Sequence, residues 1–118
     1  MYKTVVKAIG AESHLFREEN MLILFGLNAP EELKDYCYNI EVTPVTGMIE
    51  VGQVLVIGTN RYKITAVGDV VVKNLSGLGH MTIKFDGART AELPGTLHVE
   101  SGVYPTIDFE MPISIEGS

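Results

Sequence analysis

The sequence has few of the residues that crosslink a fold or contact nucleic acid. It has 118 residues, no tryptophan and a single cysteine, Cys37. One cysteine forms neither an intramolecular disulfide nor a cysteine-based metal cage, and it fits a reducing compartment. Lys and Arg number 9 against 15 Asp and Glu, which gives a net charge of -6. Because no basic excess exists to neutralise phosphates, we expect no nucleic acid partner.

Long apolar runs and nucleotide motifs are also missing. No stretch approaches the roughly 20 apolar residues that cross a bilayer, so the chain is not membrane-spanning. Residues 1–7 alternate polar and apolar, so we expect no signal peptide and a cytoplasmic location. The chain has no phosphate-binding Gly-Lys-Ser/Thr loop, dinucleotide fingerprint or Gly-x-Ser-x-Gly elbow. His14, His80 and His98 are too scattered to read as a local metal motif. We therefore expect no cofactor and no metal.

What remains is the composition of one acidic globular domain. Apolar residues make up 46% and charged residues 20% of the chain, close to globular averages. A chain of this length buries enough surface to fold without a metal or a disulfide. We find no repeat, low-complexity tract or linker, so we predict a single domain over residues 1–118.

Most of the chain alternates polar and apolar residues with the period of a β-strand. Residues 80–87 place Met81, Ile83 and Phe85 on one face, and residues 96–100 do the same with Leu97 and Val99. Further strands are expected at residues 2–9, 21–25, 54–57, 61–67 and 112–116. The Gly-Thr-Asn turn between residues 57 and 61 predicts a hairpin. The continuous apolar run 21–25 is typical of a strand covered on both faces.

Helix signals are few. Residues 28–35 combine a capping residue, Pro30 and early acids, and residues 71–79 could form a second turn before two glycines end it. Short strands at close spacing with turn residues between them indicate an all-β barrel or sandwich with one or two short helices. We expect a buried core that includes Ile23, Phe25, Val56, Ile64, Ile83 and Phe85.

His80 is the first candidate for chemistry. Strand alternation places it on the same face as Thr82 and Lys84. A neutral imidazole is a nucleophile at pH 7, and hydroxyl and ammonium groups beside it could hold a transferred phosphoryl group. The alternative interpretation is that His80 follows Gly79 to end a turn and forms only local hydrogen bonds.

Three other residues have side chains that could take part in chemistry. His98 is the second candidate, because alternation puts it on a polar face with Thr96 and Glu100, whose carboxylate could orient the ring. The alternative is an ordinary surface histidine. His14 falls in a polar loop and carries little weight. Cys37 is interpreted as a buried apolar residue, since only Lys34 is near enough in sequence to lower its pKa.

Several segments together resemble a known family. The string from Ala29 to Tyr38, APEELKDYCY, resembles a segment of the glucitol/sorbitol-specific IIA component of the bacterial phosphoenolpyruvate-dependent sugar phosphotransferase system. Further matches follow in order to about residue 100: Arg61-Tyr62, Thr65 to Gly68, Asn74-Leu75, Leu78 to His80 with Thr82, Phe85 to Gly87, Pro94 to Thr96, and His98-Val99. No single segment is diagnostic, but their order and spacing make the set specific.

The resemblance implies a small β-barrel that works as a cytoplasmic phosphocarrier. Such a protein accepts a phosphoryl group on histidine from the general phosphocarrier protein. It passes the group to the IIB partner of a membrane transporter with IIB and IIC components, which phosphorylates a hexitol during uptake. The acidic net charge is compatible with docking a basic carrier. A homodimer is left open, as are the polyol and the specific IIB partner.

One position departs from the family pattern. The resemblance places the family's phosphoacceptor histidine two residues after the aromatic residue that follows the cysteine, and this position is Ile40 here. Isoleucine cannot carry a phosphoryl group, and residues 38–52 contain no histidine. His80 and His98 match histidines of the family pattern, but the resemblance does not give them the acceptor role. Whether the chain acts in catalysis is therefore left open. The alternatives are a non-transferring relative that binds or regulates, or an unrelated small-molecule-binding barrel.

Overall fold

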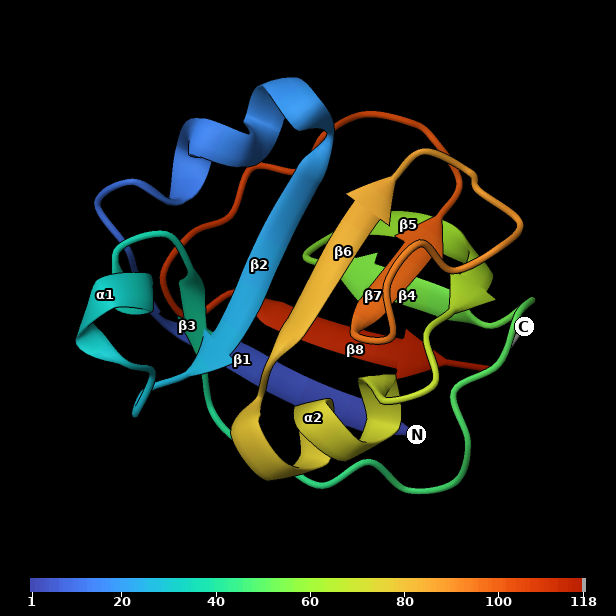
Figure 1. Ribbon diagram of the computed structural model, residues 1–118, viewed down its shortest axis with the longest axis horizontal. Helices are drawn as coiled ribbons and strands as arrows, with labels where there is room; N and C mark the ends of the chain where they lie inside the picture. Colours follow the sequence, from blue (N-terminus) through green and yellow to red (C-terminus); the bar gives the residue numbers. More distant parts are fainter. Residues whose placement is uncertain (118) are drawn as a thin grey trace.

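The alternating segments form the wall of a closed barrel in the computed structural model, which describes residues 1–117 (Figure 1). Its strands are β1 (Tyr2–Ile9), β2 (Met21–Gly26), β3 (Tyr38–Ile40), β4 (Val54–Ile57), β5 (Asn60–Val67), β6 (Met81–Phe85), β7 (Thr96–Val99) and β8 (Pro112–Glu116). Around the barrel they follow the order β1-β3-β2-β6-β7-β5-β4-β8, and β8 pairs with β1 to close it. The predicted all-β barrel is confirmed.

Neighbouring strands are antiparallel except at two places. β4 and β5 form the predicted hairpin, with Gly58 at a φ of 60° in its turn. β2 pairs in parallel with β3, and β6 pairs in parallel with β7. Because parallel neighbours need a crossover, the chain leaves the wall between these strands. The connections run through helix α1 (Glu31–Lys34) and through the loop of residues 86–95.

Three helical segments pack against the barrel, and one of them contributes Val71 and Leu75 to the main core. The two expected short helices are present as α1 and α2 (Val71–Leu78). The 3-10 helix η1 (Ser13–Glu19) was not predicted, and it contains His14, which was expected in a polar loop. η1 and α1 both lie beside β2 in Figure 1, so they flank the same part of the wall. No helix of the described residues is long and apolar enough to cross a membrane.

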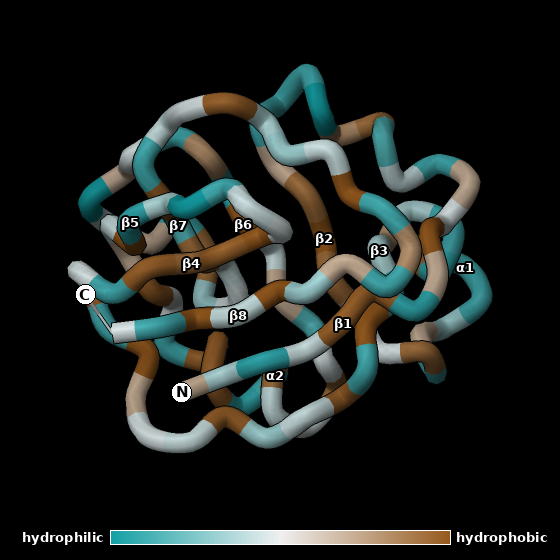
Figure 2. Tube along the Cα trace, turned by 180° about the vertical axis from the view of Figure 1, so that it is seen from behind, coloured by the Kyte–Doolittle hydropathy of each residue, from teal (hydrophilic) through white to brown (hydrophobic). Residues whose placement is uncertain are grey.

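The core fills the inside of the barrel, and hydrophobic residues recur along β1, β4 and β8 (Figure 2). Of the six expected core residues, Ile64, Ile83 and Phe85 point inward and are buried. Ile23 and Val56 are only half-buried, because alternation turns them to the outer face while their neighbours point inward. Phe25 is buried in a second, smaller cluster outside the wall with Ala29 and Cys37. The prediction for Ile23 and Val56 was wrong.

Candidate functional site

His80 is set in place by the end of α2. The helix ends at Gly79, whose φ of 68° is left-handed, and the N–H groups of Gly79 and His80 return to the carbonyls of Leu75 and Asn74. A side chain at position 79 would come within 3.1 Å of the backbone nitrogen of Gly26, and the left-handed φ adds strain for any residue other than glycine. This close contact brings His80 next to β2.

The imidazole of His80 stacks on Phe25. Their ring centroids are 4.3 Å apart and the ring planes differ by 18°. The contact follows from the register, because Leu24 pairs with Met81 and the next residues on the outer face are Phe25 and His80. His80 therefore lies on the outer wall, as the alternation predicted.

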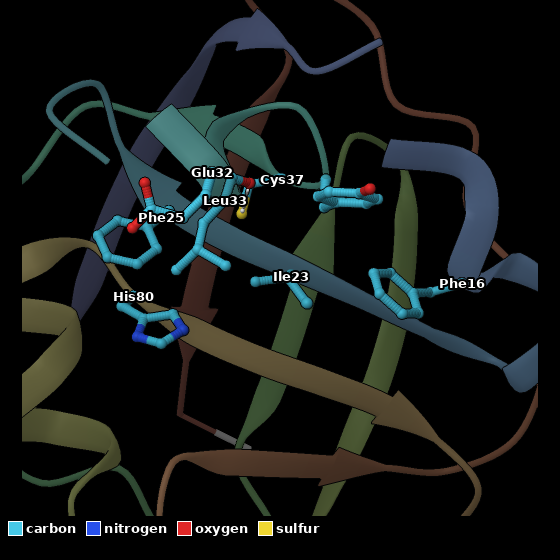
Figure 3. A pocket seen from close by; sticks show the side chains of 8 residues that line it. Phe16, Ile23, Phe25, Glu32, Leu33, Cys37 and His80 are labelled. Atoms are coloured by element: carbon cyan, nitrogen blue, oxygen red, sulfur yellow. Dashed lines mark hydrogen bonds between the residues drawn. The ribbon is translucent and has the colours of Figure 1, made fainter. Parts of the chain in front are cut away.

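The stacked rings form one end of a groove of about 240 Å³. Its lining comes from η1, β2, α1 and the residues around them: Phe16, Ile23, Phe25, Glu32, Leu33, Tyr36, Cys37 and His80. Figure 3 shows His80 and Phe25 side by side at one end and Phe16 at the other. Apart from Glu32 and His80, the lining is apolar or aromatic. The groove is therefore an apolar depression with one imidazole at its end.

His80 is chemically available. Neither ring nitrogen hydrogen-bonds another group among residues 1–117, and the residue is half-buried. Burial lowers the pKa of His80 below the ordinary histidine value. The imidazole is therefore neutral near pH 7 and keeps a nitrogen lone pair for nucleophilic attack.

Thr82 and Lys84 share the outer face with His80 but do not surround it. Lys84 is four residues further along, a distance of roughly 13 Å on a strand. Its ammonium pairs with the carboxylate of Glu92, which is the main reason that the pKa of Lys84 is raised. Thr82 is nearer and half-buried, between Ile23 on β2 and Thr96 on β7. The phosphate-holding role of these two side chains stays a prediction.

His98 is not on a solvated polar face, as the sequence suggested. It is 1% exposed, beneath the loop of residues 86–95. Its Nδ1 is 2.9 Å from an Asp86 carboxylate oxygen, and its Nε2 accepts the backbone N–H of Glu92 at 3.1 Å. Since a backbone N–H can only donate, Nδ1 carries the proton of the neutral ring. Both ring nitrogens are occupied, so His98 has no free lone pair for a phosphoryl group.

The carboxylate that orients His98 is Asp86, and the prediction of Glu100 was wrong. Glu100 instead accepts the backbone N–H of Lys63. Burial acts to raise the pKa of Asp86, but hydrogen bonds from His98 and from the backbone N–H of Ala88 outweigh it and lower that pKa. His98 thus anchors Asp86 and Glu92 of the 86–95 loop to β7.

Replacing His98 with leucine should destabilise the fold by about 2 kcal/mol, because two hydrogen bonds are lost and the Glu92 N–H is left without its acceptor. Urea denaturation measures this change. The exposed His14→Leu variant serves as the control and should stay within about 0.5 kcal/mol of the parent. A His98→Leu loss no larger than that of the control would contradict the anchoring role.

Two residues singled out in the sequence lie close to the groove. Cys37 is buried, as predicted, with its thiol on the carbonyl of Leu33, and burial raises its pKa to about 11. Ile40, at the position that the resemblance gives to the family's acceptor, has no exposed surface and belongs to the main core. It nevertheless lies under the turn before His80, since a side chain at Gly79 would come 3.4 Å from its Cγ1 atom.

Of the residues that line the groove, the sequence analysis considered only His80 and Cys37 as candidates for chemistry, and it did not predict the groove. The signal was present in the apolar run 21–25, which predicted cover on the outer face of that strand. The sequence did not show that η1 and α1 would supply the cover, because neither helix has a marked apolar face. No group of three or more His, Cys, Asp or Glu within residues 1–117 is placed to hold a metal ion.

Comparison with known proteins identifies the family. A family model described as "PTS system glucitol/sorbitol-specific IIA component" matches residues 1–114. The chain belongs to this family. The glucitol/sorbitol-specific EIIA components of Shigella flexneri and Escherichia coli K12 are each 40% identical to it over 103 residues, covering 87% of this chain and 84% of theirs. The resemblance found in the sequence is confirmed, and an unrelated small-molecule-binding barrel is set aside.

A solved structure with the same fold supports this family assignment. A crystal structure of a PTS system IIA component from Enterococcus faecalis V583 matches this IIA protein with a TM-score of 0.85 at 26% identity. The match covers 98% of this chain and 99% of the other. The eight-stranded barrel is therefore shared along nearly the whole length of both proteins.

Proposed function

We propose that this IIA protein is a cytoplasmic phosphocarrier that takes a phosphoryl group on His80 from the general phosphocarrier protein. It then passes the group to the IIB partner of a glucitol or sorbitol transporter with IIB and IIC components. The observation that supports this role is the neutral, unpaired imidazole of His80 at the end of a concave groove. The other two histidines differ, because both ring nitrogens of His98 are held in hydrogen bonds and His14 is exposed on η1.

The chemistry is a nucleophilic displacement at phosphorus. A lone pair on an imidazole nitrogen of His80 forms the N–P bond while the bond from phosphorus to the donor's leaving atom breaks. The second transfer reverses these roles, with His80 as the leaving group. Stacking on Phe25 restricts the rotation of the ring, so the attacking nitrogen is oriented before the donor arrives.

The proposal is tested by incubating the protein with labelled phosphoenolpyruvate, the general kinase of the system and the general phosphocarrier protein. We expect a label that is lost in acid and retained in base, as a phosphohistidine is. No label after prolonged incubation, with the phosphocarrier itself labelled, would overturn the relay.

A specific observation favours a second candidate, a non-transferring IIA relative that binds or regulates. Ile40 occupies the position that the resemblance gives to the acceptor, and it is a core residue of the barrel. In that case the same experiment yields no label, while the groove still binds a partner. A homodimer stays a prediction, which sedimentation of the purified protein measures.

A further inference from the structure

The loop of residues 86–95 joins β6 to β7, on the flank of β6 opposite to β2 (Figure 1). Both of its ends are tied to the barrel by backbone hydrogen bonds. Near its start, the N–H of Gly87 donates to the carbonyl of Val99 at 2.8 Å. Near its end, the carbonyl of Pro94 accepts the N–H of Val70 at 3.0 Å. Any movement of this loop is therefore confined to its middle.

The middle segment, residues 89–92, is held to the barrel at one residue. Both hydrogen bonds that it makes to the rest of residues 1–117 come from Glu92. The Glu92 carboxylate pairs with the ammonium of Lys84, but it is exposed, so water and salt screen this ion pair. The Glu92 backbone N–H donates to Nε2 of His98, which is buried. The bond to His98 is thus the main attachment of the segment.

His98 keeps this attachment only while its ring is neutral. Nε2 accepts the Glu92 N–H, so no lone pair is left there for a proton. A proton on Nε2 would set two donors against each other in a buried site, which costs free energy because neither finds an acceptor. The Asp86 carboxylate lies 2.9 Å from the other ring nitrogen and stabilises the imidazolium. Protonation therefore requires Glu92 to move away, while the contact with Asp86 is kept.

The charged groups that face His98 come from β6 and from the loop. Burial acts to raise the pKa of Asp86, but hydrogen bonds from His98 and from a backbone N–H outweigh it and lower that pKa, so the carboxylate stays ionised in mild acid. Lys84, the register partner of His98 on β6, is paired with Glu92. On the other side, β5 places the uncharged Ala66 opposite His98. Among the described residues, Asp86 is the one charged group in hydrogen-bond contact with the ring.

We propose that His98 is a pH-sensitive latch for residues 89–92: a proton on its Nε2 releases the Glu92 N–H, and the segment moves away from β7. The open form binds one more proton than the closed form, so falling pH favours opening. Because one proton is involved, the open-to-closed ratio rises by at most about tenfold for each unit of pH.

Opening changes the surface on the β7 side of β6. The segment forms one side of a hollow of about 460 Å³, whose other side is the end of β5 and the turn that follows it. Thr96 and His98, both 1% exposed in the closed form, are uncovered when the segment leaves. The latch is independent of the proposed phosphoryl relay, because no step of it involves His80.

The latch is tested by NMR on the whole protein between about pH 8 and pH 5, the range in which histidines change charge. The ring-nitrogen shifts of His98 report its protonation. Hydrogen exchange, corrected for its intrinsic pH dependence, reports the protection of single backbone N–H groups. The Glu92 N–H should lose protection roughly tenfold or more, with the same midpoint as the ring. The Gly87 N–H should keep its protection, because the carbonyl of Val99 holds it without His98.

Two variants separate His98 from other titrating groups. His98→Gln has no titrating ring, so its Glu92 N–H should show no loss of protection with pH, and circular dichroism checks the fold. Asp86→Asn keeps an oxygen for the ring N–H but loses the charge that stabilises the imidazolium. Its midpoint should therefore move to lower pH by about one unit or more. Asp108→Asn, which removes an exposed acid from the loop of residues 100–111, is the matched control and should keep the parent midpoint.

Three results would overturn the latch. The His98 ring could stay neutral over the whole range, or it could become charged while the Glu92 N–H keeps its protection. In the third, the Glu92 N–H of His98→Gln loses protection as in the parent. If His98→Gln does not fold, Asp86→Asn still decides, because an unmoved midpoint would contradict the imidazolium–carboxylate contact on which opening depends.

Discussion

A His80→Gln variant should accept no phosphoryl label from the general phosphocarrier protein, a loss of at least a hundredfold in transfer rate. Glutamine is close in size and polarity but has no nucleophilic ring nitrogen, so the N–P bond cannot form. Its amide can still pack against Phe25, so the barrel should unfold at the same urea concentration as the parent. Acid-quenched time courses with labelled phosphocarrier measure the rate directly.

The other two histidines provide the controls for this experiment. His14→Gln removes an exposed side chain and should be labelled at the parent rate. His98→Gln changes a buried residue, so its labelling is compared only after its fold is checked. If His80→Gln were labelled at the parent rate, the acceptor would be another residue and the assignment would be wrong.

Phe85→Ala should destabilise the barrel by about 3–5 kcal/mol, the usual result of deleting a large core side chain. Phe85 is 2% exposed and is the last residue of β6. Its ring meets Tyr62 and Tyr104 edge to face, with centroids 4.9 Å and 5.6 Å away. Alanine would leave a cavity and remove both aromatic contacts, since a closed barrel wall relaxes little.

Urea unfolding of Phe85→Ala measures this loss, with Phe109→Ala as the matched control. Phe109 is 63% exposed, so its truncation should cost less than about 0.5 kcal/mol. A loss below about 1 kcal/mol for Phe85→Ala would place this face of β6 in solvent and reverse the strand assignment.

The sequence predicted the strands of the barrel because each has a local signal. Alternation and continuous apolar runs together identified seven of the eight strands, alternation gave the inward face of β6, and two strands joined by a glycine turn identified the β4–β5 hairpin. β3 was missed because its three residues are too few for a strand signal in the sequence. Its pairing with β1 and β2 is decided by residues far away in the chain.

The candidate site could be predicted only in part. Alternation placed His80 on an outer face, and the apolar run of β2 predicted cover outside the wall. Pattern could not show that Phe25 would stack on His80, because that contact needs the β2–β6 register. Similarly, His98 appeared exposed because strand alternation describes only the wall and not the 86–95 loop that covers it.

By itself, the sequence determined the family, the all-β class, the acidic charge and the side of the wall on which His80 lies. These properties depend on composition or on neighbours within a few residues. The tertiary structure alone decided three features: both ring nitrogens of His98 are held by hydrogen bonds, Ile40 is a core residue under Gly79, and η1 and α1 complete an apolar groove beside His80. Each of these depends on contacts between segments distant in the chain, which closure of the barrel creates and local periodicity does not encode.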